Sequence, residues 1–270
     1  HTMTHTTGGE TDFSTWIREI EGCRHVLARY GNIPREEIRG FRAPFLDYGP
    51  AHFDALSALG FDYDCSVYER PGFRSEDGGS LIWPYTLHEG LQQTGDTGLP
   101  PTNSLPDLVE VPMWCLLSDA GAYTMDPPGS RESLTELFQT NLTMRYEGNR
   151  APLGIWLHPG WLDEPGHAAA LNDFIEWAQS HTGVWFTPVG MLHDWVRNPV
   201  PLDRIEQEGV LAVQTRDPVD ESEAEFCRFA HGSFRTCGVR APAYPVPSNA
   251  FHGCLPVGEV SAEICVISEW

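Results

Sequence analysis

The chain has 270 residues, of which 41% are hydrophobic and 11% aromatic, enough for one large domain, or one domain with a small companion. Its formal net charge is −21, and all 17 basic residues are Arg, because the sequence contains no Lys. Such an acidic chain should repel nucleic acid and anionic membranes, and no stretch approaches the roughly 18 apolar residues that cross a bilayer. We therefore expect neither nucleic-acid binding nor membrane insertion.

Helices and strands are expected to alternate along the first 200 residues or so. Apolar residues spaced three and four apart predict helices over 12–30, 50–59, 131–146, 167–181 and 189–198, the first capped by Asp12. Short apolar runs predict strands over 38–43, 61–67, 108–116, 153–158 and 184–186. Between them, 69–107 is rich in Gly, Pro and Ser and is expected to be a long surface insertion. This alternation predicts an α/β layer or barrel with mainly parallel strands, whose chemistry gathers where strands end.

From about residue 202 the alternating pattern ends and cysteine becomes frequent. Four of the seven cysteines lie in the last 44 residues, at spacings of 10, 17 and 11. The four are Cys227, Cys237, Cys254 and Cys265. None forms a CxxC pair, so a secreted, disulfide-stabilised segment is favoured over a zinc ribbon. The sequon Asn141-Leu142-Thr143 would suit a secreted protein, but it falls in an expected helix.

Three short motifs offer chemistry. The run His1-Thr2-Met3-Thr4-His5 places two imidazoles four residues apart, which can face one metal ion. Arg42, directly before Ala43-Pro44, is a rigidly placed donor suited to holding a carboxylate. His158 ends an apolar run before Pro159-Gly160 and can reach into a cleft as general acid or base. Each motif alone also fits an ordinary surface or core residue, so their order along the chain carries the interpretation.

In that order the motifs resemble those of the NodB-homology polysaccharide deacetylases (carbohydrate esterase family 4), and more narrowly the chitin deacetylases of arthropod type. That family has a His-(Ser/Thr)-x-x-His motif, an Arg-x-Pro-(Tyr/Phe) motif, an aspartate-bearing strand and a late motif ending in His. The corresponding segments here are 1–5, 42–45, 61–66 and 157–158. Trp83-Pro84-Tyr85-Thr86 and residues 149–154 resemble the arthropod subgroup in particular. The resemblance covers about residues 1–200.

The resemblance implies a role for each matching residue. His1 and His5 would bind a divalent metal, most commonly zinc. Arg42 would orient the catalytic carboxylate, and the backbone N–H of Phe45 would help to hold the oxyanion. His158 would be the general acid that protonates the leaving amine.

Two further positions follow from the same resemblance. Asp64 would be the partner that tunes His158. Trp156 stands where the family often has an aliphatic residue lining the acetyl pocket, so the pocket here would be narrower. Apart from the resemblance, Trp161, like Trp83 and Trp114, could be an exposed platform on which sugars stack, although burial in the core is the commoner fate of Trp.

The family's first motif, a Phe-Asp-Asp strand, lies upstream of the His pair. One Asp of that motif is the general base and the other is the third metal ligand. Because the sequence opens on His1, it reads as a fragment that lacks both carboxylates. The implied fold is a NodB-like irregular (β/α) barrel over residues 1–200, incomplete at its N-terminus, followed by a Cys-rich segment of unknown role over 201–270.

The implied function of the parent protein is the secreted, zinc-dependent removal of acetyl groups from chitin or a related N-acetylglucosamine polysaccharide, with release of acetate. Activity is expected to be impaired in this chain. Three alternatives stay open. One is a non-catalytic carbohydrate-binding or matrix protein with the deacetylase fold. Another is a deacetylase of a different acetylated glycan, such as peptidoglycan or acetylxylan. The third, an unrelated metal hydrolase, would leave the placement of Arg42, Asp64 and His158 unexplained.

Overall fold

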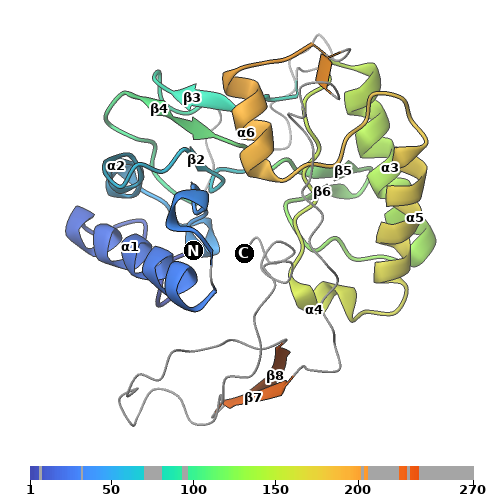
Figure 1. Ribbon diagram of the computed structural model, residues 1–270. Helices are drawn as coiled ribbons and strands as arrows, with labels where there is room; N and C mark the ends of the chain where they lie inside the picture. The colour runs from blue at the N-terminus through green and yellow to red at the C-terminus, as the bar shows by residue number, and fades with distance from the viewer. Residues whose placement is uncertain are drawn as a thin grey trace. The chain divides into compact units, whose positions relative to one another are not determined.

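Figure 1 shows the computed structural model of the chain. The structure describes residues 1–5, 8–31, 33–69, 81–92, 97–201 and 204–205, and the backbone of 225–229 and 232–236. The chain divides into two compact units, one containing His1–Ile20 and Arg39–Ala212 and the other Glu21–Ile38 and Val213–Glu269. All candidate site residues belong to the first unit. The side chains of the four C-terminal cysteines lie outside the described part, so their predicted pairing stays a prediction.

The five predicted helices are confirmed to within two residues at each end. The helices are α1 (Phe13–Tyr30), α2 (Pro50–Ala58), α3 (Arg131–Glu147), α4 (Pro159–Leu162), α5 (His167–Gln179) and α6 (Val189–Arg197), with 3-10 turns η1 (Arg35–Glu37) and η2 (Pro44–Leu46). The strands are β1 (Gly40–Phe41), β2 (Tyr63–Asp64), β3 (Tyr85–Leu87), β4 (Leu105–Glu110), β5 (Leu116–Ser118), β6 (Gly121–Tyr123), β7 (Glu225–Phe229) and β8 (Gly232–Thr236). None of the described helices combines the length and hydropathy that a membrane span requires.

The start of α1 follows from the chemistry of Asp12. Its Oδ1 accepts the Thr15 N–H (3.0 Å) and the Ser14 hydroxyl (2.6 Å), as an N-cap carboxylate does. The Ser14 hydrogen bond, followed by those from Thr15, lowers the pKa of Asp12 to about 2. One turn further on, Trp16 and Ile20 are buried against Phe41 and the other residues of the core beneath the sheet.

The main sheet has the strand order β1-β2-β4-β3. Strands β1, β2 and β4 run parallel, and β3 joins the edge antiparallel to β4. The register pairs Phe41 with Asp64, and Asp64 with Glu110, so these three residues form one row across the carboxyl ends of the parallel strands. The expected surface insertion over 69–107 is therefore partly wrong, because it contributes the edge strand β3 to this sheet.

The structure confirms a mixed α/β chain, whereas the described residues do not confirm a barrel. They contain the four-stranded sheet and two separate hairpins, β5–β6 and β7–β8. The predicted strands over 153–158 and 184–186 are wrong, since neither stretch joins a sheet. In the first stretch, Asp126 takes the place of a neighbouring strand. Its N–H donates to the Trp156 carbonyl (3.1 Å), and its Oδ1 accepts the His158 N–H (2.7 Å).

Helices α3 and α5 lie side by side, with an apolar core between them and β5 (Figure 1). Asn141 of α3 is fully buried. Its Oδ1 accepts the Leu117 N–H (2.8 Å), and its Nδ2 donates to the carbonyls of Leu117 and Leu137 (both 2.9 Å). The side-chain amide of the sequon thus joins α3 to β5 and is inaccessible for glycosylation in the folded chain.

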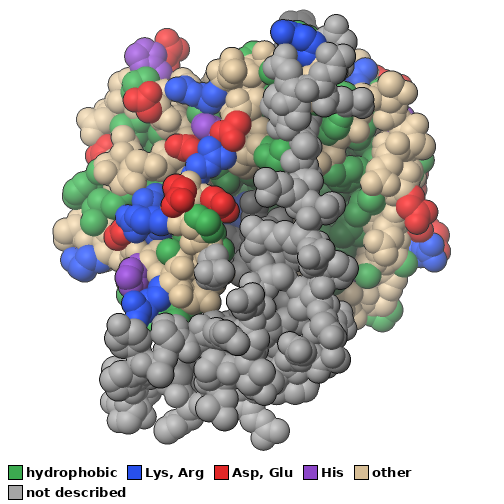
Figure 2. Space-filling view, in the orientation of Figure 1, with side chains coloured by type: hydrophobic (Ala, Val, Ile, Leu, Met, Phe, Trp, Pro, Cys, Tyr) green, Lys and Arg blue, Asp and Glu red, His purple; other side chains and the backbone are tan. Residues whose placement is uncertain are grey.

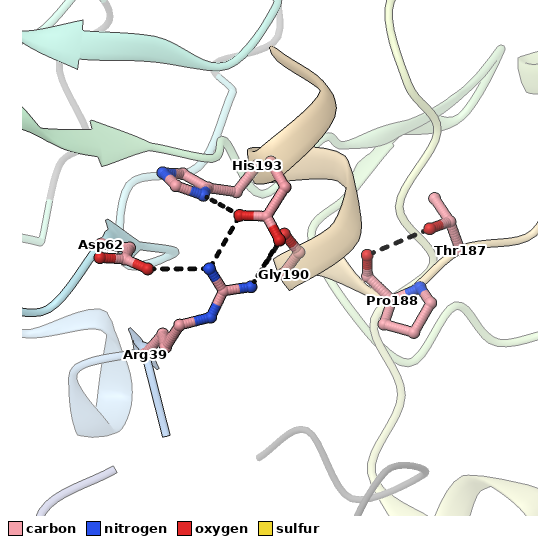
Figure 3. Close-up of polar contacts among 7 residues, drawn as sticks. Arg39, Asp62, Thr187, Pro188, Gly190 and His193 are labelled. Carbon is pink, nitrogen blue, oxygen red and sulfur yellow. Dashed lines mark hydrogen bonds and ion pairs between the residues drawn. The ribbon is translucent and has the colours of Figure 1, made fainter. Parts of the chain in front are cut away.

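Arg39 connects helix α6 to the segments that precede β1 and β2 (Figure 3). Its guanidinium forms a two-point contact with the Asp194 carboxylate (2.8 and 2.9 Å) and a third contact with Asp62 Oδ2 (3.0 Å). His193 Nδ1 lies 3.1 Å from Asp194 Oδ1. The Arg39 hydrogen bonds are the main cause that lowers the pKa of Asp194. Side chains of both signs also adjoin elsewhere on the visible surface, which offsets part of the net acidity locally (Figure 2).

We expect Asp194→Asn to lower the free energy of unfolding by about 1 kcal/mol at neutral pH, because Arg39 loses its charged partner. The pKa of Asp194 is depressed in the folded chain, so this contribution is complete above the unfolded value of about 3.9 and is lost as the pH falls below it. Urea unfolding of wild type and variant from about pH 7 to about pH 3 checks this. The gap should narrow toward the acidic end, and Asp119→Asn, on the β5–β6 turn, should show none. A gap of constant size would contradict the assignment.

Candidate active site

The two histidines of the first motif lie together. The ring centroids of His1 and His5 are 4.9 Å apart, with the rings nearly perpendicular. The segment that carries them is fixed to α1, because Glu19 Oε2 accepts both the backbone N–H (2.9 Å) and the hydroxyl (3.0 Å) of Thr4. His5 has a left-handed backbone (φ 54), which is uncommon outside glycine and turns its ring back toward His1 and Phe45.

The geometry of this pair is compatible with two of the ligands of a metal site. His1 Nδ1 lies 2.8 Å from the Arg42 carbonyl oxygen, which can only accept, so the proton is on Nδ1 and the lone pair is on Nε2. A histidine that binds a metal commonly donates its other ring N–H to a carbonyl in this way. The described residues contain no group of three or more His, Cys, Asp or Glu side chains that could hold a metal ion. The described part of the chain therefore offers two candidate ligands, His1 and His5, and no third one beside them.

The loop after β1 brings Arg42 and Phe45 to the same place. Arg42 Nε donates to the Cys65 carbonyl (3.1 Å), and its guanidinium lies over the Trp156 ring, 4.2 Å from the centroid. Phe45 has a left-handed backbone (φ 59), and its ring is 64% exposed and meets His5 edge-on, with centroids 5.0 Å apart. No hydrogen bond among the described residues takes up the Phe45 N–H. That free donor, next to the histidine pair, suits a developing oxyanion.

Asp64 lies at the centre of a buried polar cluster below this loop. The side chains of Asp64, His52, Ser66 and Glu110 are all fully buried. Ser66 donates to Asp64 twice, from its hydroxyl to Oδ1 (2.8 Å) and from its N–H to Oδ2 (3.0 Å), and His52 Nε2 lies 3.2 Å from Oδ1. Asp64 is thus bound to Ser66 and lies next to His52, and these contacts of Asp64 do not include His158.

Glu110 is the member of this cluster that the sequence analysis missed. The strand register places it next to Asp64, and its Oε1 accepts the Val67 N–H (3.1 Å). Burial, and then the neighbouring Asp64 carboxylate, raise the pKa of Glu110 well above its usual range. The available signal was a carboxylate within the run Leu108-Val109-Glu110-Val111, whose other three residues are apolar. A carboxylate in such a run indicates a buried acidic group that needs a partner.

His158 has Asp126, and not Asp64, as its partner. Its ring Nδ1 contacts Asp126 Oδ2, and its N–H donates to Oδ1 of the same carboxylate (2.7 Å). Asp126 has a left-handed backbone (φ 48), a conformation that Asp tolerates better than most residues. The predicted tuning of His158 by Asp64 is therefore corrected, because the carboxylate that contacts Nδ1 belongs to Asp126. The His158 side chain is 59% exposed.

The burial of each tryptophan decides whether it can have its predicted role. Trp156 is 8% exposed and is covered by Arg42, so it lies at the site. Trp161 and Trp114 are 6% and 2% exposed, and their indole N–H groups donate to the carbonyls of Pro127 (2.8 Å) and Ile82 (2.7 Å). Both are core residues, so the suggested sugar-stacking role is corrected for them. Trp83 is half-buried and lies near Trp195, with ring centroids 6.0 Å apart.

A continuous series of contacts joins the two ends of the candidate site. His1 contacts the Arg42 carbonyl, and the Arg42 side chain covers Trp156. The Trp156 carbonyl accepts the Asp126 N–H, and Asp126 holds His158. Residues that are up to 157 positions apart in the sequence, His1 and His158, thus belong to one connected arrangement. It combines an imidazole pair, a free backbone donor, an arginine and a carboxylate-bound histidine, which together can serve amide hydrolysis.

Comparison with known proteins supports the resemblance that the motifs indicate. Chitin deacetylase 8 of Bombyx mori is 29% identical over 230 residues, which is 77% of this chain and 57% of that protein. Chitin deacetylase 1 of Bombyx mori is 25% identical over 206 residues, 68% of this chain and 36% of that protein. The chain resembles arthropod chitin deacetylases. It spans 57% and 36% of the lengths of these two relatives.

A solved structure described as a polysaccharide deacetylase, from Mycobacterium smegmatis, aligns with a TM-score of 0.48 and 22% identity over 81% of this chain and 66% of that one. No protein-family model matches the sequence. The resemblance to the chitin deacetylases therefore comes from the aligned sequences and the ordered motifs.

We expect the stability of Glu110→Gln, relative to that of wild type, to increase as the pH rises. The raised pKa means that folded Glu110 keeps its proton while the unfolded side chain, with a pKa near 4.3, ionises. The unfolded state therefore binds fewer protons, and the wild type loses stability with rising pH. The amide retains the acceptor for Val67 and can donate to Asp64.

The measurement is the free energy of unfolding from about pH 4 to about pH 8, where the difference between variant and wild type should shift by at least about 1 kcal/mol in favour of Gln. Glu89→Gln, at an exposed turn, serves as the matched control. A difference that does not change with pH would mean that Glu110 ionises normally in the folded chain.

Proposed function

We propose that the parent protein is a metal-dependent polysaccharide deacetylase that removes the N-acetyl groups of chitin or a related N-acetylglucosamine polymer. The observation that carries the proposal is the series of contacts joining the His1–His5 pair to His158, on a chain that resembles chitin deacetylases. In this reaction water attacks the acetamide carbonyl, the C–N bond breaks, and the products are acetate and a free amine on the sugar. A polymer of this kind is extracellular, so we also propose that the protein is secreted.

His1 and His5 would hold a divalent cation, and zinc suits imidazole ligands. When bound, the metal supplies Lewis-acid polarisation of the carbonyl and activation of water. The two carboxylates that the resemblance places ahead of His1 would provide the base and the third ligand. The tautomer of His1, fixed by the Arg42 carbonyl, supports the assignment because it keeps the lone pair on Nε2.

The Phe45 N–H would hold the oxyanion that develops on the substrate, and Arg42 would orient the catalytic carboxylate. The Phe45 N–H lacks a protein partner within the described part of the chain, and the Phe45 ring lies against His5, so this N–H is the candidate donor to the oxyanion. Arg42 is held by the Cys65 carbonyl and by the face of Trp156. A guanidinium fixed at two points can orient a carboxylate without rearrangement. The exposed Phe45 ring offers an apolar face to the sugar.

His158 would supply the proton that the departing amine needs. The Asp126 carboxylate fixes the ring through Nδ1, which leaves Nε2 as the nitrogen that would donate the proton from a side chain that is 59% exposed. Once the amine has taken that proton, it leaves as a neutral group and the C–N bond can break. The pair thus does the work of an acid held in place by a carboxylate.

We expect His158→Ala to lower kcat for acetate release by at least about 10²-fold in the full-length parent protein, since the leaving amine loses its proton donor. The assay measures acetate released from N-acetylglucosamine oligomers, peptidoglycan fragments and acetylxylan, before and after chelation and on return of zinc. His88→Ala, at an exposed turn, is the matched control. Oligomer binding without acetate release would favour a non-catalytic carbohydrate-binding protein, and release from another glycan alone would favour that substrate.

Asp126→Asn should lower kcat by about 10²-fold with little change in KM, because the neutral amide holds the ring less firmly in the orientation that donates the proton. Asn also tolerates the left-handed backbone found at Asp126, so the fold should be preserved. Steady-state kinetics with the N-acetylglucosamine oligomer, next to the control Asp163→Asn at an exposed turn, measure the effect. An unchanged kcat would remove Asp126 from the proposed machinery.

A further inference from the structure

The loop that carries Arg42 and Phe45 is attached to the segment that follows the neighbouring strand. Backbone pairing between β1 and β2 continues one step past the strands, where the Cys65 N–H donates to the Phe41 carbonyl (2.8 Å). Beyond that point a side chain replaces the backbone as the partner. The Ala43 N–H donates to the Ser66 hydroxyl oxygen at 2.8 Å. Ser66 therefore extends the pairing of two parallel strands into the candidate site.

The direction of the hydrogen bonds at Ser66 is fixed by chemistry. The Ala43 N–H can only donate, so the hydroxyl oxygen accepts from it and the hydroxyl proton goes to Asp64 Oδ1 (2.8 Å). The Ser66 N–H donates to Asp64 Oδ2 (3.0 Å), which holds the serine from a second point. Ala43, Asp64 and Ser66 are all fully buried, so water cannot take over any of these bonds.

The backbone directly after Ala43 needs such an anchor. Phe45 and Leu46 have φ values of 59 and 56, a left-handed conformation that non-glycine residues hold only when their surroundings impose it. The Leu46 N–H donates to the Ala43 carbonyl (3.1 Å), so the strained turn is hydrogen-bonded to Ala43. Ser66 holds the other side of Ala43 through its N–H. Loss of the Ser66 hydroxyl would remove the buried hydrogen bond that holds Ala43, the residue to which this turn is bonded.

We propose that Ser66, itself held by Asp64, is a positioning residue that keeps the Arg42–Phe45 loop in the conformation that presents the Phe45 N–H. The catalytic consequence rests on the function proposed above, whereas the anchoring can be tested without it. This role also gives Asp64 a function in the site that requires no contact with His158. Asp64 acts on the loop through the serine.

The first test is amide hydrogen exchange of the chain as it exists, in wild type, Ser66→Ala and Ser66→Thr. We expect exchange at Ala43 and Leu46 to become at least about tenfold faster in Ser66→Ala, with little change in α3 and α5, and to return toward wild type in Ser66→Thr. Ser66→Cys, which has a similar volume and a weak donor, should behave as Ser66→Ala and replaces it should that variant be unstable. Ser57→Ala, at an exposed position in α2, is the control.

The second test is kinetic and uses the full-length parent protein with the N-acetylglucosamine oligomer. We expect Ser66→Ala to lower kcat about tenfold, with KM within about twofold of wild type, and Ser66→Thr to recover most of the loss. A displaced oxyanion donor has this signature, whereas a general loss of folded protein would lower the active fraction and leave kcat per folded molecule unchanged.

The outcomes separate the two proposals. Unchanged exchange at Ala43 and Leu46 overturns the anchoring role, and faster exchange with an unchanged kcat overturns the positioning role. Faster exchange together with a kcat loss that Thr reverses supports both. If the wild-type parent releases acetate from no glycan, the proposed function fails, and the exchange result alone then decides whether Ser66 anchors the loop.

Discussion

A carboxylate that is wholly removed from solvent is costly unless each oxygen has a partner, and Asp64 satisfies this requirement at the carboxyl end of β2. One oxygen receives the Ser66 hydroxyl and faces His52, and the other receives the Ser66 N–H. The next carboxyl along the row, Glu110, is subject to the same constraint, and burial raises its pKa well above the usual range. The loop after β1 takes its position from this buried cluster, and with it the residues that could meet a substrate.

The rest of the candidate site is built by side chains that cross between loops. Arg42 reaches the Cys65 carbonyl on one side and the Trp156 face on the other. Asp126 takes both the His158 N–H and the ring Nδ1. Such contacts carry little intrinsic strength at the surface, but those of Arg42 meet the buried residues Cys65 and Trp156, where water does not readily replace a lost contact. The geometry of the site thus depends on a few polar contacts more than on the length of the strands beneath it.

Sequence patterns predicted the helices better than the strands, for a physical reason. A helix of nine or more residues displays several turns of apolar periodicity, as α3 and α5 do, so its pattern is hard to produce otherwise. Strands of two or three residues, such as β1 and β2, show no period at all. An apolar run such as 153–158 predicts a strand. In the structure, however, backbone groups of this run form hydrogen bonds with Asp126 and not with a neighbouring strand. Residue spacing along a chain does not reveal which carboxylate meets which histidine, so His1, His5 and Arg42 could be named from motifs whereas Asp126 and Glu110 could not.

The buried Asn141 of α3 has a consequence for how the chain matures. Both N–H groups of its amide donate within the fold and its Oδ1 accepts the Leu117 N–H, so an enzyme that transfers glycans could reach it only before α3 packs against β5. A sugar attached at that moment would occupy the space that β5 needs and would hold the helix away from its partner. In a compartment where glycosylation accompanies synthesis, modification and folding would therefore compete for the same side chain. The fraction of chains glycosylated at Asn141 would then depend on how fast α3 packs against β5.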